Sequence, residues 1–90
     1  MALDVHAYED GKMGQLLFQI DDKVYGDLRP AFELFRQRTG LSVDPYGDLV
    51  VDSALPALIS ALTEVHASSL LSSILEECVR TGRSVILVGD

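Results

Sequence analysis

The side chains of this chain that could ligate a metal do not have the spacing of the common metal sites. The two histidines, His6 and His66, lie sixty positions apart, and Asp4 lies two positions before His6. Structural zinc needs four cysteine or histidine ligands at short spacing. Acids recur every four positions over residues 44–52, but a calcium loop requires them at its first, third, fifth and twelfth positions. We therefore expect no metal and no other cofactor.

Nucleophilic catalysis also lacks a suitable group. Cys78 falls on the apolar side of an expected helix beside Glu76 and Glu77, whereas a reactive thiolate needs a basic, exposed setting. The serines of residues 68–73 have the spacing of helix caps and exposed helix surface. The chain has no glycine-rich phosphate loop and no Gly-x-Ser-x-Gly turn. The sequence predicts a protein without enzymatic activity.

The chain is short and acidic, which restricts its partners. It has 90 residues and a formal net charge of −7, and residues 41–77 hold six acids and no base. A negative surface disfavours nucleic-acid binding, whereas it would speed association with a basic protein. The alternative interpretation is that the charge only keeps the protein soluble. The length fits a single domain over residues 1–90, and one cysteine fits the reducing cytoplasm. No apolar run exceeds four residues, so no membrane span is expected.

The beginning of the chain predicts a β-hairpin. Residues 3–8 alternate between apolar and polar side chains, as a half-buried strand does. Residues 15–20 form the second strand, in which we expect Leu16, Phe18 and Ile20 to face inward. An Asp-Gly pair between the two strands favours a tight hairpin turn.

An amphipathic helix is expected after the hairpin. Asp27 is a favourable N-cap whose charge suits the helix dipole. Pro30 is tolerated in the first turn, and Gly40 fits the position that follows the last helical residue. Tyr25 then belongs to the turn before the helix.

A turn, a short strand and a second helix should follow. Asp44-Pro45-Tyr46-Gly47 has the residues of a type I turn. Residues 49–51 are short and apolar, as in a brief strand. Ser53 can cap the next helix, which puts Pro56 at its third position.

The rest of the chain predicts a third helix and a final strand. Ser69 is a candidate cap for a helix that stops before Gly82. One continuous helix over 54–81 is the alternative, but it would be long for this domain, so we expect a break near Ala67. Residues 85–88 are all apolar, which is typical of a strand covered on both faces. The expected fold is α+β: a small mixed sheet of three to four strands, with an N-terminal hairpin and a central C-terminal strand, packed against two to three helices.

Several short motifs resemble those of a loose group of small, uncharacterised bacterial proteins. Residues 39–47 match a Thr-Gly-x-x-x-Asp-Pro-Tyr-Gly centre, and Leu3-Asp4-Val5 and Val88-Gly89-Asp90 match the ends. Some small acidic members of the group look like immunity proteins of toxin systems. The resemblance implies no catalytic residues.

These observations favour a non-catalytic protein-binding module, an immunity protein being one form of it. Its partner would be another protein, with a basic surface, reached through acids and tyrosines. A self-associating structural domain, forming a homodimer through a sheet edge or apolar patch, is the alternative. The polar side of the first strand is either a solvated edge or part of a contact patch. The candidate contact residues are Asp4, His6, Tyr8, Tyr25, Asp44, Tyr46, Asp48 and Asp52.

Overall fold

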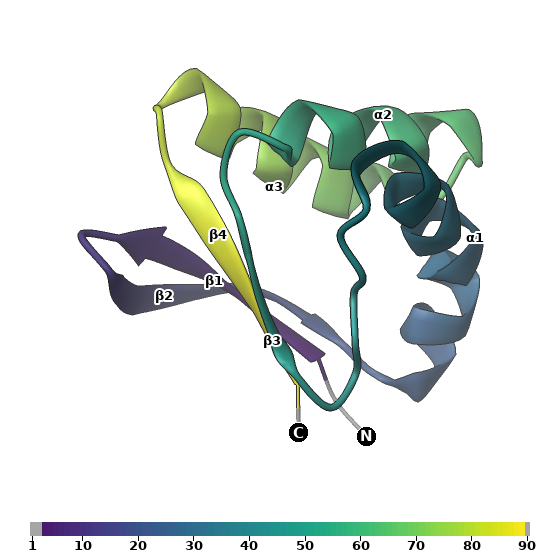
Figure 1. The fold of residues 1–90 in the computed structure, drawn as a ribbon, viewed down its shortest axis with the longest axis horizontal. Coiled ribbons are helices and arrows are strands. Elements are labelled where there is room, and N and C mark those ends of the chain that lie inside the picture. Colours follow the sequence, from purple (N-terminus) through teal and green to yellow (C-terminus); the bar gives the residue numbers. More distant parts are fainter. Residues whose placement is uncertain (1–2, 90) are drawn as a thin grey trace.

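The computed structural model describes residues 3–89, which form one sheet and three helices (Figure 1). In chain order the elements are β1 (Leu3–Glu9), β2 (Lys12–Ile20), α1 (Asp22–Thr39), β3 (Asp48–Val51), α2 (Leu55–Glu64), α3 (Ser69–Arg80) and β4 (Ser84–Gly89). The predicted α+β fold is confirmed.

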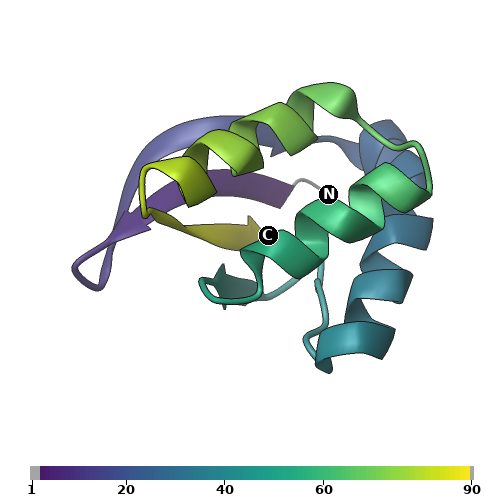
Figure 2. The ribbon, with the colours of Figure 1, turned by 90° about the horizontal axis from the view of Figure 1, so that it is seen from above.

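The sheet is antiparallel between all neighbouring strands described, rather than mixed as expected from the sequence. Its strand order is β2-β1-β4-β3, so β4 is central, as predicted, and β2 and β3 are the two edges. The three helices lie on one side of the sheet, and α2 packs against both α1 and α3 (Figure 2). Over residues 3–89 the domain therefore has two layers, and one face of the sheet has no helix on it.

The core lies between the sheet and the helices. Val5 of β1 and Val85 and Leu87 of β4 point toward the helices and are buried. Their neighbours Ile86 and Val88 point the other way and are only partly buried. The expectation that the last strand is covered on both faces is therefore wrong, because within residues 3–89 the helices cover only one.

The hairpin is confirmed, with a difference in which side chains face inward. Asp10 and Gly11 have φ angles of 53° and 74°, as a type I′ turn requires at both central positions. The β1–β2 pairing then shifts register twice. Each one-residue shift turns the following side chains to the opposite face. Leu16 consequently pairs with His6 on the side away from the helices and is 43% exposed, so the prediction that it faces inward is wrong.

Helix α1 begins earlier than the sequence indicated. Its N-cap is Asp21, whose Oδ1 accepts the Val24 N–H at 2.8 Å, and not Asp27. Tyr25 is therefore helical, and Pro30 lies inside the helix instead of in its first turn. A proline there removes one backbone hydrogen bond, and burial of residues such as Phe32 against the core offsets that loss. The helix ends before Gly40, as predicted.

The caps of the two later helices are each displaced by one residue from those predicted. Ala54, not Ser53, precedes α2, because the Leu55 N–H donates to the Asp52 carbonyl at 3.0 Å and turns the chain into the helix. Ser68, not Ser69, caps α3, and its Oγ accepts the Leu71 N–H at 3.1 Å.

The predicted break between these helices is confirmed, and its cause is a backbone turn. The Ala67 N–H donates to the Leu62 carbonyl at 2.9 Å, which closes the end of α2. His66 adopts a left-handed φ of 55° in this turn. Such a residue ends a helix, so α2 and α3 are separate although neither glycine nor proline divides them.

Candidate binding face

The face of the sheet that the helices leave uncovered, here called the open face, is the strongest candidate for a functional surface. Strand alternation and register place eleven side chains on it. They are Asp4, His6, Tyr8, Met13, Leu16, Gln19, Asp48, Val50, Ser84, Ile86 and Val88.

The middle of the open face is a row of three apolar side chains and one histidine that crosses all four strands, here called the apolar row. The register aligns Leu16 of β2, His6 of β1, Ile86 of β4 and Val50 of β3. Leu16 and Val50, at the two ends of the row, are 43% and 41% exposed. The His6 Nδ1 donates to the carbonyl of Gly14 at 3.1 Å, which orients the imidazole along the sheet. Exposed apolar surface of this kind is typical of contact sites.

Two of the candidate aspartates lie together in the next row. The register aligns Gln19, Asp4, Val88 and Asp48, so Asp4 and Asp48 are separated by a single strand. The Gln19 amide donates to the Asp4 carboxylate at 3.4 Å. One end of the open face is thus acidic, whereas its centre is apolar.

The turn before β3 fixes the acidic end of the face. The predicted turn forms: the Gly47 N–H donates to the Asp44 carbonyl at 3.2 Å, and the Asp44 carboxylate accepts the Tyr46 N–H at 2.8 Å. The Gly89 N–H of β4 then donates to the Gly47 carbonyl at 2.9 Å. A Cβ on Gly89 would lie 2.5 Å from the Pro45 carbonyl oxygen, so this approach requires glycine.

The structure groups some of the predicted contact residues and separates others. Asp4, His6, Tyr8 and Asp48 share the open face. Asp44 and the 72% exposed Tyr46 adjoin its acidic end through the turn.

Two of the predicted contact residues lie apart from that end. Tyr25 belongs to α1, where its ring packs against Phe32 with centroids 5.7 Å apart. Asp52 follows β3 at the end opposite to Asp48. The three aspartates of residues 44–52 therefore do not form one cluster.

Sequence reasoning missed the apolar half of this surface. Met13, Leu16, Val50, Ile86 and Val88 were not among the predicted contact residues. Their place on this face follows only from the pairing of β2 and β4 with β1, because residues paired with the polar side of β1 share its face.

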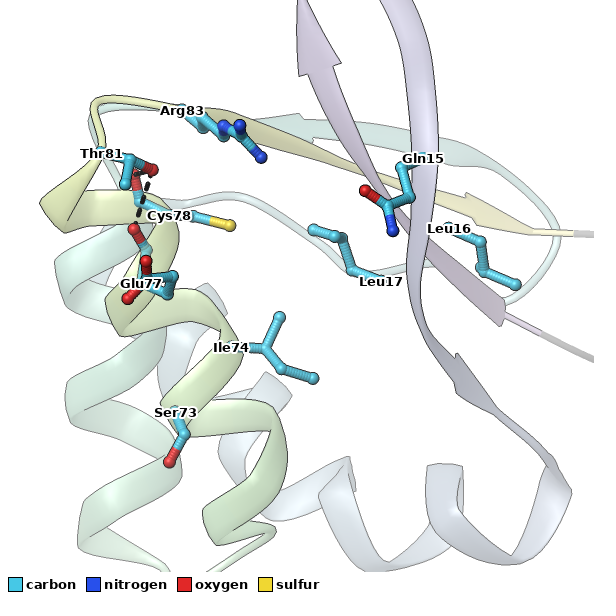
Figure 3. A pocket seen from close by; sticks show the side chains of 9 residues that line it. All are labelled: Gln15, Leu16, Leu17, Ser73, Ile74, Glu77, Cys78, Thr81 and Arg83. Atoms are coloured by element: carbon cyan, nitrogen blue, oxygen red, sulfur yellow. Dashed lines mark hydrogen bonds between the residues drawn. The ribbon is translucent and has the colours of Figure 1, made fainter.

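The single thiol lies in a separate pocket between α3 and β2. Cys78 points into a pocket of about 440 Å³, beside Leu17 and Ile74 and near Arg83 (Figure 3). Burial raises the pKa of the Cys78 thiol, Arg83 opposes the rise and Glu77 adds to it. A buried, protonated thiol behaves as a small apolar side chain.

The two histidines lie in different parts of the molecule. His6 lies on the open face, whereas His66 lies in the turn between α2 and α3. Within residues 3–89, no three histidine, cysteine or acidic side chains are placed to hold a metal ion together.

Comparison with known proteins adds no relative. No protein-family model matches the sequence, and neither the curated proteins nor the solved structures contain a match. None of the helices in the described part of the chain is long and apolar enough to cross a membrane.

Proposed function

We propose that this chain is a non-catalytic protein-binding module that binds a basic surface of another protein through its open face. The observation that supports this most is the apolar row from Leu16 to Val50, which crosses the whole sheet and has no helix over it. Protein interfaces commonly have an apolar centre bordered by polar groups. Here Asp4 and Asp48 supply a border on one side.

The negative charge of the chain favours a partner with a basic surface. The chain carries a net charge of −7, and two carboxylates lie in the row beside the apolar centre. Complementary charge chiefly raises the rate of association and orients the partner. The partner surface should therefore combine apolar side chains with lysine or arginine opposite Asp4 and Asp48.

An immunity protein is the narrower form of this proposal. In that case the basic partner is a toxin or effector domain, and binding blocks the surface that the toxin needs. Support comes from the resemblance of the 39–47 motif and from the small acidic domain itself. The motif residues make the turn that precedes β3, so they would act by placing Asp48 for contact with the partner.

Affinity capture with matched variants tests the proposal. Leu16→Lys places a positive charge on the open face, and Leu70→Lys places one at a leucine of α3 that is 63% exposed. We expect a protein recovered by the wild type and by Leu70→Lys, but lost with Leu16→Lys, because the new charge repels a basic surface. Circular dichroism should show that both variants are folded.

The recovered protein then serves in a kinetic measurement. Replacing Asp4 and Asp48 with asparagine should slow its association more than it speeds its dissociation, and the difference should shrink at high salt. Recovery of the same proteins by Leu16→Lys and by the wild type, or of none by the wild type, would refute the proposal.

A further inference from the structure

The two edges of the sheet differ in their ability to accept another strand. β2 and β3 each pair with one neighbour, so each leaves one side of its backbone unpaired within the sheet. The register of β2 against β1 shifts twice, which bends the strand and interrupts regular pairing. β3 pairs with β4 without interruption from Asp48 to Val51. Regular, unbulged edges are the ones that accept an added strand.

The side chains of β3 show what an added strand would meet. Leu49, Val50 and Val51 form an apolar segment with an exposed aspartate at each end, Asp48 and Asp52. Val50 and Asp48 point to the open face, and Leu49 and Val51 point to the helices. A strand beside β3 would extend the apolar row by one more residue, next to Val50.

The charges disfavour a second copy of this chain as the occupant. In an antiparallel pair of β3 strands centred on Val50, Asp48 of one copy lies opposite Asp52 of the other. A parallel pair in register aligns Asp48 with Asp48. Like charges opposite each other on adjacent strands are destabilising. The complementary occupant instead carries a basic residue at each end of a short apolar segment.

We infer that β3 accepts an added β-strand from a partner protein, formed by a segment of three apolar or β-branched residues between two lysines or arginines. The inference deepens the proposed function and rests on it, because the added strand continues the open face. Backbone hydrogen bonds would hold the segment, and the Asp48 and Asp52 carboxylates would select its basic ends.

A synthetic peptide tests this inference directly. The probe is acetyl-Lys-Val-Thr-Val-Lys-amide, titrated into the ¹⁵N-labelled chain at low salt. We expect amide shifts in residues 48–52 and not in β2. A peptide with glutamate in place of both lysines should cause no shift. Methylation of the backbone nitrogens of the lysine peptide should abolish its binding.

Matched protein variants separate charge from fold. Asp48→Asn with Asp52→Asn should weaken peptide binding about fivefold, since each exposed ion pair contributes a few tenths of a kcal/mol or more. Asp10→Asn with Glu76→Gln removes the same charge at exposed sites away from β3 and should leave binding unchanged. The inference would be overturned if the amide shifts were confined to another element, or if no shift occurred at millimolar peptide. It would also be overturned if both pairs of substitutions weakened peptide binding equally.

The two proposals can fail separately. If the peptide does not bind β3 but Leu16→Lys still abolishes capture of a partner, the open face stands and the added strand does not. If the peptide binds β3 but no captured protein depends on Leu16, the edge accepts strands and the proposed function of the open face is wrong.

Discussion

The two faces of the sheet are built from alternate residues of the same strands, yet different forces determine them. Toward the helices, Val5, Val85 and Leu87 are almost completely buried and supply the core. On the open face, Leu16 and Val50 are more than two-fifths exposed although both are apolar. Folding explains the first set, because burial of apolar surface is its main driving force. It does not explain the second, and this difference is why we assign binding to the open face.

The largest predicted effect on stability comes from substituting two neighbouring residues of β4 whose side chains lie on opposite faces of the sheet. Leu87→Ala removes a side chain that is 3% exposed and should lower the free energy of unfolding by about 2–5 kcal/mol. Ile86→Ala, on the open face, should lower it by only about 1 kcal/mol, because part of that side chain is already in water. Urea unfolding followed by circular dichroism measures both. Equal losses of unfolding free energy in the two variants would contradict the stated difference between the two faces of the sheet.

A smaller loss of stability is expected from a substitution at the end of the sheet that a loop, and not a helix, covers. Gly89→Ala should lower stability by about 1–3 kcal/mol, because the new Cβ would lie 2.5 Å from the Pro45 carbonyl oxygen and displace the turn before Asp48. Gly26→Ala in α1 is the control, since no atom within 4 Å opposes its Cβ. Thermal unfolding should show a lower midpoint for Gly89→Ala alone. Unchanged midpoints in both variants would contradict the close approach of Gly89 to the Pro45 carbonyl.

The smallest effect should lie outside both faces, at the ion pair between α1 and α2. The Arg38 Nη2 donates to Glu64 Oε1 at 2.9 Å, and this hydrogen bond lowers the pKa of the Glu64 carboxyl. A lowered pKa adds stability above the unfolded-state value, and that stability is lost as the pH falls through the folded-state value.

Glu64→Gln should therefore be slightly less stable than the wild type at pH 7 and equal to it near pH 3. Urea unfolding at the two pH values measures the difference. A gap that persists unchanged at pH 3 would show that the carboxylate charge has no part in it.

The sequence was a good guide to elements whose signals are local. The Asp10-Gly11 turn and the turn ending at Gly47 each depend on a few adjacent residues, and each forms where expected. The break near Ala67 also forms, although it was expected from the length of the alternative helix and not from a local signal. The predicted start of α1 was wrong, because Asp21 and Asp27 are both good caps and the helix begins after the earlier one.

The candidate site was less predictable, because a surface depends on pairing between distant strands. Asp4, His6 and Tyr8 could be recognised as one side of a strand from alternation alone. Their apolar neighbours could not: Leu16 joins them only through the register shifts of β2. Ile86 joins them only because β4 lies next to β1. Neither fact is encoded within the segments concerned.

The strand order also has a consequence for how the chain reaches its native state. The two central strands, β1 and β4, are separated by all the other elements in sequence, and Leu3 pairs with Gly89. Until the last strand has been synthesised, the hairpin lacks its inner neighbour and leaves Val5 in water. Contacts so distant in sequence form slowly, and unpaired strands invite aggregation meanwhile. Productive folding of this domain therefore waits until β4 has been made, and the interval before that is when a chaperone would be of most use.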